Sequence, residues 1–206
     1  MRTIDTSTVE EAVYRAALRA GVSLTASCRS ALDKAYAAED EGAAKFALGK
    51  LIENSNIARE KVMPVCQDTG MAVVLLEIGN EVCFEGAPLP EAVNSGVRRA
   101  YSDGYFRKSV CDPITRKNTA DNTPAAIHTE VVAGDRVKLT FMPKGFGSEN
   151  MSALYMLKPA QGTEGIIDAI VNTVKSAGSR PCPPVYVGVG ICGTFDGCAF
   201  LAKKAL

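Results

Sequence analysis

The hydrophobic pattern of the chain changes at Pro64, and this change limits the folds that it can adopt. Before Pro64, apolar side chains recur every three or four positions in segments 8–21, 23–42 and 42–61, which predicts three helices. Beyond Pro64, apolar and β-branched residues gather in short runs bounded by glycine, proline or asparagine, which is typical of strands. The sequence therefore predicts helices first and a sheet afterwards.

Several runs after Pro64 carry strand signals. Segments 71–80 and 81–86 would pair with each other through the Gly-Asn turn between them. Segment 125–145 would form a hairpin around residues 133–135, and the apolar run 183–190 would be a buried strand.

Three further segments, 90–105, 162–178 and 193–206, have helical patterns, and residues 107–124 form a long polar loop of a kind that is often functional. The predicted fold class is α+β, with N-terminal helices followed by a mixed, partly antiparallel sheet packed with helices. We expect one domain over residues 1–206.

The charge balance argues against two classes of partner. Lysine and arginine together number 23, as do aspartate and glutamate, so the formal net charge is zero. A neutral chain lacks the basic excess of a nucleic-acid binder. No apolar run approaches the roughly 18 residues of a membrane span, and the N-terminal segment lacks the apolar core of a secretory signal. We therefore expect neither a nucleic acid nor a membrane as partner.

The number of cysteines is odd, and no signal peptide points to an oxidising compartment. We therefore expect a reduced, cytoplasmic protein without a disulfide framework. In that setting cysteines serve as small core residues, metal ligands or nucleophiles. The seven are Cys28, Cys66, Cys83, Cys111, Cys182, Cys192 and Cys198.

Two cysteines have unusual neighbours. Residues 63–74 crowd Cys66, an amide, a carboxylate and a hydroxyl between a proline and a strand. This segment is either a site at the mouth of the sheet or a turn in which Asp68 bonds local backbone. Cys182 lies between two prolines, which restrict the backbone; it is either a rigidly held metal thiolate or a packed cysteine.

Other polar residues have similar double interpretations. The glycines of segment 142–150 could form a nest for an anion. Arg107 either binds a carboxylate through two parallel N–H bonds or is a solvated charge. His128 is the only histidine, and its strand setting favours a hydrogen-bonded core residue over an acid or base.

Residues 188–193 read GVGICG and match the G-x-G-x-x-G pattern of dinucleotide sites. Such a site needs an acidic residue on a second strand about 20 residues further on, and only 13 residues follow Gly193. The glycines instead indicate a tight turn with close backbone approach.

Taken together, six stretches resemble one family. They read PVCQDTG, GYFRKSV, RKNTADNTPAAIHTEVVAGD, PKGFGSENMSALYML, PAQGTEGI and PCPPVYVGVGICGTFDGCAFLAKKAL. In this order they resemble the α-subunit, or N-terminal domain, of class I iron–sulfur fumarate hydratases and the related L-tartrate dehydratases. The resemblance extends from about Leu51 to Leu206.

The resemblance implies a hydro-lyase with a [4Fe–4S] cluster. In that family three cysteines hold three irons, and the fourth iron keeps an open position where it acts as a Lewis acid. Cys66 matches the first family ligand and Cys182 matches the second.

The resemblance also implies a set of substrate contacts. Gln67 and Asp68 match catalytic side chains that contact the substrate near the open iron. Arg107 matches the arginine that pairs with a substrate carboxylate, and Gly145 and Gly147 match a turn that offers backbone N–H groups. The implied substrate is a small dicarboxylate: fumarate and malate first, tartrate as the alternative.

The chain departs from the family pattern in what it lacks. The third ligand of the family lies beyond Leu206, so we expect the C-terminal part of the domain to be missing, and no other cysteine of this chain matches that ligand. The family's base lies on a β-subunit or C-terminal domain, which we expect as a partner in an oligomer. A non-catalytic assembly domain is the alternative from another functional class.

Overall fold

A computed structural model describes residues 1–206. By its internal contacts the chain divides into two compact units, Met1–Lys144 and Gly145–Leu206, called here the first and the second unit. Each is described by itself. The expectation of a single domain stays a prediction.

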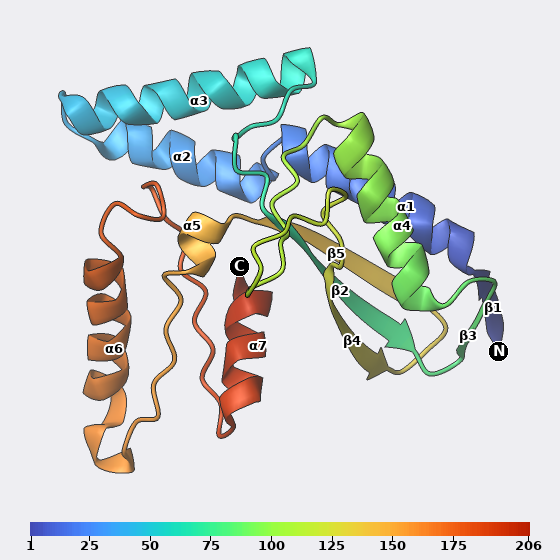
Figure 1. The fold of residues 1–206 in the computed structure, drawn as a ribbon. Helices are drawn as coiled ribbons and strands as arrows, with labels where there is room; N and C mark the ends of the chain where they lie inside the picture. The colour runs from blue at the N-terminus through green and yellow to red at the C-terminus, as the bar shows by residue number, and fades with distance from the viewer. The chain divides into compact units, whose positions relative to one another are not determined.

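The α+β class is confirmed, and the N-terminal helices lie where the apolar periodicity places them (Figure 1). The first unit contains β1 (Arg2–Asp5), α1 (Thr6–Val22), α2 (Ala26–Ala38), α3 (Ala43–Lys61), β2 (Met71–Gly79), β3 (Val82–Glu85), α4 (Leu89–Asp103), β4 (Ala126–Val132) and β5 (Val137–Lys144). The second unit contains α5 (Phe146–Glu149), the short 3₁₀ turn η1 (Pro159–Gln161), α6 (Gly162–Ala177) and α7 (Phe195–Ala205). No helix combines the length and the apolar content that crossing a bilayer requires.

The mixed sheet is built around β2. The strand order is β4-β2-β5, with β4 parallel and β5 antiparallel to β2 (Figure 1). The middle of β2 is buried from Ala72 to Leu76, as expected for a strand with a partner on each side. Because β2 supplies both ladders, it orients the loop that enters it at Met71.

Two predicted strand pairings are wrong, although the strands themselves are present. β2 and β3 do not pair with each other, since β3 forms a parallel ladder with β1. β4 and β5 are not a paired hairpin, because β2 lies between them. The connection between β4 and β5 passes around the end of β2, where Gly79 N–H donates to the Arg136 carbonyl at 2.8 Å. A Cβ at Gly79 would lie 2.3 Å from the Gly134 oxygen, so this crossing requires glycine.

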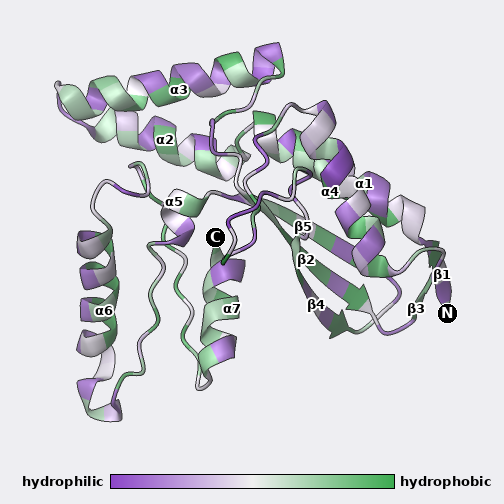
Figure 2. Cartoon of the chain, in the orientation of Figure 1, coloured by the Kyte–Doolittle hydropathy of each residue, from purple (hydrophilic) through white to green (hydrophobic).

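The core of the first unit lies between the sheet and a pair of helices. α1 and α4 lie side by side over one face of the sheet (Figure 1). The most buried cluster draws on both helices and on β2: Val9, Val13, Ala72, Val74, Leu76, Val93, Val97, Tyr101 and Phe106. Along α3, by contrast, hydrophobic and hydrophilic residues alternate (Figure 2), and few of its side chains are buried.

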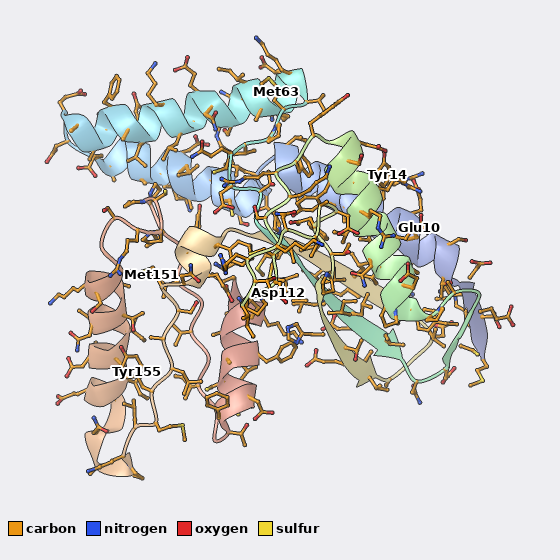
Figure 3. The ribbon with its side chains drawn as sticks, in the orientation of Figure 1. Glu10, Tyr14, Met63, Asp112, Met151 and Tyr155 are labelled. Atoms are coloured by element: carbon orange, nitrogen blue, oxygen red, sulfur yellow. The ribbon has the colours of Figure 1, made fainter.

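Polar contacts join α1 to α4 outside this core. The Arg99 guanidinium bonds the carboxylates of Glu10 and Glu11 and stacks 3.8 Å from the centre of the Tyr14 ring. The Tyr14 hydroxyl donates to Asp103 at 3.1 Å, and this bond raises the pKa of Tyr14. Figure 3 shows Glu10 and Tyr14 along α1 beside α4. Both the apolar core and these polar contacts therefore stabilise the packing of α4, which carries Tyr101, against α1.

Gly96 lets α4 approach α1 closely, and Gly96→Ala is expected to destabilise the protein. A Cβ there would lie 2.5 Å from the Glu10 oxygen and 2.9 Å from the Val13 Cβ. Overpacking of this kind costs about 1–3 kcal/mol in the free energy of unfolding, which denaturant titration measures. Gly49→Ala in α3 is the matched control: its Cβ would meet only the edge of the Tyr36 ring at 3.3 Å, and alanine should gain about 0.5–1 kcal/mol of helix propensity. Equal effects of the two changes would contradict the packing argument.

The second unit contains helices but no strand. The predicted strand at 183–190 is wrong: the segment has no ladder partner within the unit, and Val185, Tyr186 and Val187 are each more than a third exposed. Its glycines do allow the predicted close approach. A Cβ at Gly188 would lie 2.2 Å from the Ala202 oxygen, and one at Gly190 would lie 2.1 Å from the Cys198 oxygen. The segment therefore packs its backbone directly on α7.

The helix boundaries follow local signals with small shifts. α1 begins at Thr6, two residues before the predicted start at residue 8, because the Asp5 carboxylate accepts from Ser7 N–H at 2.8 Å and caps the helix there. Gly178 ends α6 at a φ of 56°, at the last residue of the predicted helical segment 162–178.

Candidate active site

The loop that leads into β2 carries the first group of predicted site residues. Cys66 and Gln67 are exposed, Asp68 is half-buried, and Thr69 and Gly70 are buried. Cys66, Asp68 and Thr69 line a hollow of about 150 Å³ in the first unit. Its other walls come from α1 and from Val65, Tyr101, Phe106 and Pro143. This hollow, called here the Cys66 hollow, places a thiol and a carboxylate on one concave surface.

The backbone of this loop is tied to α4 beneath it. The buried Tyr101 hydroxyl donates to the carbonyl oxygens of Thr69 and Gly70 at 3.0 and 3.2 Å. Burial, with a contribution from the Asp68 charge, raises the pKa of Tyr101, so the hydroxyl remains a donor throughout the physiological range. Gly70 N–H donates to the Asp68 carboxylate at 3.2 Å. The predicted local turn at Asp68 is therefore present, and the same carboxylate also lines the hollow.

Arg107 is joined to this loop through its backbone. The Thr69 hydroxyl donates to the Arg107 carbonyl oxygen at 3.0 Å. The preceding Phe106 is buried and packs edge-on against Tyr101, with ring centres 5.4 Å apart. The Arg107 side chain is exposed and makes no ion pair, so its guanidinium is available to an anion.

The segment 107–124 has no helix or strand, as predicted, yet its side chains order it. One Asp112 carboxylate oxygen accepts from the backbone N–H of Ile114, and from the N–H and hydroxyl of Thr115. These bonds lower the pKa of Asp112, which Figure 3 labels. The Asn118 amide donates to the Lys108 carbonyl oxygen at 2.8 Å. The loop therefore presents Arg107 from a defined base.

Asn122 is a structural contributor that the sequence analysis did not single out. Its side chain is completely buried. Its amide oxygen accepts from the N–H groups of Ser109 and Val110 at 2.7 and 3.1 Å, and its amide nitrogen donates to the Gly70 oxygen at 3.0 Å. The only available signal was an asparagine inside the long polar loop, and nothing in the sequence identified its partner 52 residues away.

The second group of predicted residues lies in the second unit. Gly145 precedes the single turn of α5, and its carbonyl oxygen accepts from Glu149 N–H and the Ser148 hydroxyl. A Cβ at Gly147 would lie 3.2 Å from the Arg180 oxygen, so Gly147 lies beside the segment that leads into Cys182. The structure therefore brings Gly147 near the Cys182 segment within this unit.

Cys182 is exposed and has an unusual backbone. It adopts a left-handed φ of 56°, and its N–H donates to the Ser179 oxygen at 3.1 Å. The interpretation as a packed cysteine is wrong for Cys182, since the thiol faces solvent.

The donor chemistry fits an iron–sulfur group in part. Cys66 and Cys182 are both exposed thiols on loops, and thiolates are the usual ligands of such clusters. No group of three or more His, Cys, Asp or Glu side chains gathers in an arrangement that would hold a metal ion. The structure thus offers two exposed cysteines as candidate ligands, one in each unit.

Two further cysteines and the histidine are exposed in the structure. The cysteines are Cys83 and Cys192. Cys83 is exposed because side chains alternate along β3, which leaves Val82 and Phe84 half-buried and Cys83 on the other face. His128 is exposed on β4, so the prediction of a core histidine is wrong. β4 is an edge strand of the sheet, which leaves one of its sides open.

Asp121, next to Asn122, should make the stability of the folded protein depend on pH in the acid range. Burial raises the pKa of Asp121, but hydrogen bonds from Thr123 and Arg98 outweigh that effect and lower it to about 2. Because the pKa in the folded state lies below the unfolded value of about 3.9, this stabilisation is complete above pH ~4 and is lost as the pH falls towards ~2. The melting temperature of Asp121→Asn should therefore lie below that of the wild type at neutral pH, and the gap should narrow over that interval. A gap independent of pH would contradict this assignment.

The sequence matches one family model and is similar to several known proteins. A family model described as fumarate hydratase (Fumerase) matches residues 10–206. The chain is 38% identical over 204 residues to a protein of Methanocaldococcus jannaschii named putative L(+)-tartrate dehydratase subunit alpha, which covers 96% of this chain and 72% of the relative.

Other relatives are longer. The anaerobic class I fumarate hydratase of Escherichia coli is 32% identical over 154 residues, which is 73% of this chain and 28% of that protein. A putative class I fumarate hydratase of Geobacillus stearothermophilus is 27% identical over 208 residues, which is 95% of this chain and 40% of that protein. The chain thus spans less than a third of the Escherichia coli protein and less than half of the Geobacillus one.

Proposed function

The chain belongs to the fumarate hydratase (Fumerase) family, and from this premise we propose that it is the α-subunit, or N-terminal portion, of a hydro-lyase acting on a small dicarboxylate. The observation that carries the proposal is the Cys66 hollow. There a thiol and a carboxylate face a concave surface, and Arg107, with no ion pair of its own, is bonded to the same loop. A dicarboxylate that loses water needs both a grip on a carboxylate and a group that orients its hydroxyl.

Each residue of the first unit has a defined task in this proposal. The Arg107 guanidinium binds one substrate carboxylate through two parallel N–H donors. The Asp68 carboxylate and the Gln67 amide orient the hydroxyl that leaves. Asp68 can hold that orientation because Gly70 N–H restrains its carboxylate.

The second unit contributes a ligand and backbone donors. We assign Cys182, with Cys66, to the [4Fe–4S] cluster that the family resemblance implies, and exposed cysteines suit that group. Gly145 and Gly147 offer backbone N–H groups to a carboxylate. When bound, such a cluster supplies a Lewis acid that makes hydroxide a better leaving group.

The proposed enzyme is complete only with a partner. A β-subunit or C-terminal domain would supply the base that takes the carbon-bound proton, and the assembly would be an oligomer. The name of the Methanocaldococcus relative, a subunit alpha, supports a two-subunit arrangement. A cytoplasmic location stays a prediction.

Fumarate and tartrate chemistry are the two candidate specificities. We propose reversible hydration of fumarate to malate first, in line with the family model. L-Tartrate dehydration is the alternative, because the relative with that name shares 38% identity over 96% of this chain.

One experiment separates these candidates. The full chain is co-expressed with a candidate β-subunit, iron and sulfide are reconstituted without oxygen, and kcat/KM is measured for L-malate and for L-tartrate. Higher kcat/KM with malate supports the fumarate assignment, and higher kcat/KM with tartrate supports the alternative. Turnover of neither by a cluster-loaded complex would overturn the hydro-lyase proposal and favour a non-catalytic assembly domain.

A further inference from the structure

We propose that Asn122 is a positioning residue, which holds the Asp68 loop and the Arg107 segment in one relative orientation. The inference rests on the proposed function, because it assigns to Asn122 the alignment of two groups that would hold one dicarboxylate. Asn122 itself lines no part of the Cys66 hollow.

The hydrogen bonds of Asn122 reach both segments at once. Its amide oxygen accepts from Ser109 and Val110, two and three residues after Arg107. Its amide nitrogen donates to the Gly70 oxygen. The N–H of the same Gly70 donates to the Asp68 carboxylate. A single buried side chain is thus bonded both to the backbone that follows Arg107 and to Gly70, whose N–H bonds Asp68.

The chemistry of the position suits asparagine in two respects. The site needs an acceptor on one side and a donor on the other, and the primary amide supplies both in one rigid plane. The backbone at Asn122 is left-handed, with a φ of 62°, a conformation that asparagine tolerates better than most residues. Aspartate would keep the acceptor oxygen but lose the N–H donor to Gly70.

Two neighbouring bonds show what is specific to Asn122. Thr69 joins its own loop to the Arg107 oxygen through one hydroxyl, and Tyr101 bonds only carbonyl oxygens of that loop. Asn122 instead makes three bonds, two to the Arg107 segment and one to Gly70. Asn94 supports the far end of the polar loop, where its amide oxygen accepts from Ala125 N–H at 2.8 Å. Asn94 is therefore a matched control: a partly buried asparagine bonded to the same loop without a bond to Gly70.

The consequence for catalysis is geometric. A substrate that Arg107 binds and Asp68 orients reacts only when the two side chains have the correct relative position. A displacement of one side chain by about 1 Å can cost on the order of 100-fold in rate. Removing the amide of Asn122 should lower kcat/KM about 10- to 100-fold while iron content stays unchanged.

The test uses Asn122→Gly, since glycine accepts the left-handed backbone and only the amide is lost. Hydrogen exchange of the full chain is followed by mass spectrometry, and kinetics are measured in the reconstituted complex. We expect faster exchange at Ser109 and Val110, whose N–H groups lose their acceptor, and at Gly70, whose N–H bond to Asp68 loosens once its carbonyl loses the Asn122 donor. We also expect a rise in KM as well as a fall in kcat. Asn94→Ala should leave exchange at Gly70 and kcat/KM close to the wild type.

A second variant covers the case in which Asn122→Gly does not fold. Asn122→Asp keeps the acceptor oxygen, so exchange should stay slow at Ser109 and Val110. It loses the donor to the Gly70 carbonyl, so exchange should rise at Gly70 and kcat/KM should again be reduced.

Three results would count against these assignments. Unchanged exchange in both segments, or joint loosening with unchanged kcat/KM, would overturn the positioning role. A wild-type complex inactive on both L-malate and L-tartrate would overturn the proposed function instead. The exchange data on the chain would still decide whether Asn122 couples the two segments.

Discussion

Cys66→Ser should abolish turnover in the reconstituted complex and sharply reduce its iron content. A serine hydroxyl is a poor substitute for a thiolate ligand of iron, and loss of even an outer-shell partner of a metal site typically costs 10- to 100-fold, so we expect a fall in kcat of at least about 100-fold. Because Cys66 is exposed on a loop, the change should leave the melting temperature of the protein almost unaltered. Iron analysis, the visible absorbance of the cluster and kcat are the measurements.

Cys83→Ser provides the control for this change. Cys83 is also an exposed cysteine of the first unit, but it lies on β3 and lines no part of the Cys66 hollow. Full iron content and rate are expected for that variant. A Cys66→Ser complex with wild-type iron and rate would show that Cys66 is not a ligand.

Arg107→Ala should weaken the use of either dicarboxylate without loss of iron. Hydrogen bonds between charged partners contribute about 1.5–3 kcal/mol each, so loss of the carboxylate grip should lower kcat/KM by roughly 10- to 150-fold, mainly through KM. Arg107→Lys should recover only part of the loss, because an ammonium cannot make two parallel N–H bonds to a carboxylate. Steady-state kinetics with L-malate and L-tartrate provide the measurement.

Lys108→Ala is the matched control for charge. Lys108 is the next residue, is also exposed, and carries the same charge, but its backbone carbonyl oxygen accepts from Asn118, whereas that of Arg107 accepts from Thr69 of the Asp68 loop. If the two alanine variants raise KM equally, the effect is a general loss of positive charge and the specific role of Arg107 is wrong.

The local elements of the fold were predictable to within a few residues. The apolar runs of β2, β4 and β5 and the periodic helices α1 to α4, α6 and α7 all appear where the side-chain pattern places them. β1 and the single turn of α5 were not predicted. The predicted strand at 183–190 is absent, because an apolar run becomes a strand only when another strand can pair with it. In the second unit its glycines instead pack on α7.

The candidate site was predictable only where a motif marks it. Cys66, Asp68 and Arg107 stand out by family resemblance, and the structure joins the loop of the first two to the third through Thr69. Asn122 did not stand out, because its residue type suits any turn of a polar loop. Its complete burial and its bond to Gly70 distinguish it, and both exist only in the folded chain.

By itself, the sequence determined most of the helices and most of the strands of the sheet, since the spacing of apolar side chains is a local property. It also carried the cysteine, carboxylate and arginine that make a hydro-lyase site a reasonable proposal. Only the tertiary structure decided that β2 lies between β4 and β5 and that the one amide of Asn122 bonds both Gly70 and the backbone of Ser109 and Val110. The physical reason is the same in both cases: strand partners and buried hydrogen bonds join residues far apart in the chain, and burial against those partners selects them.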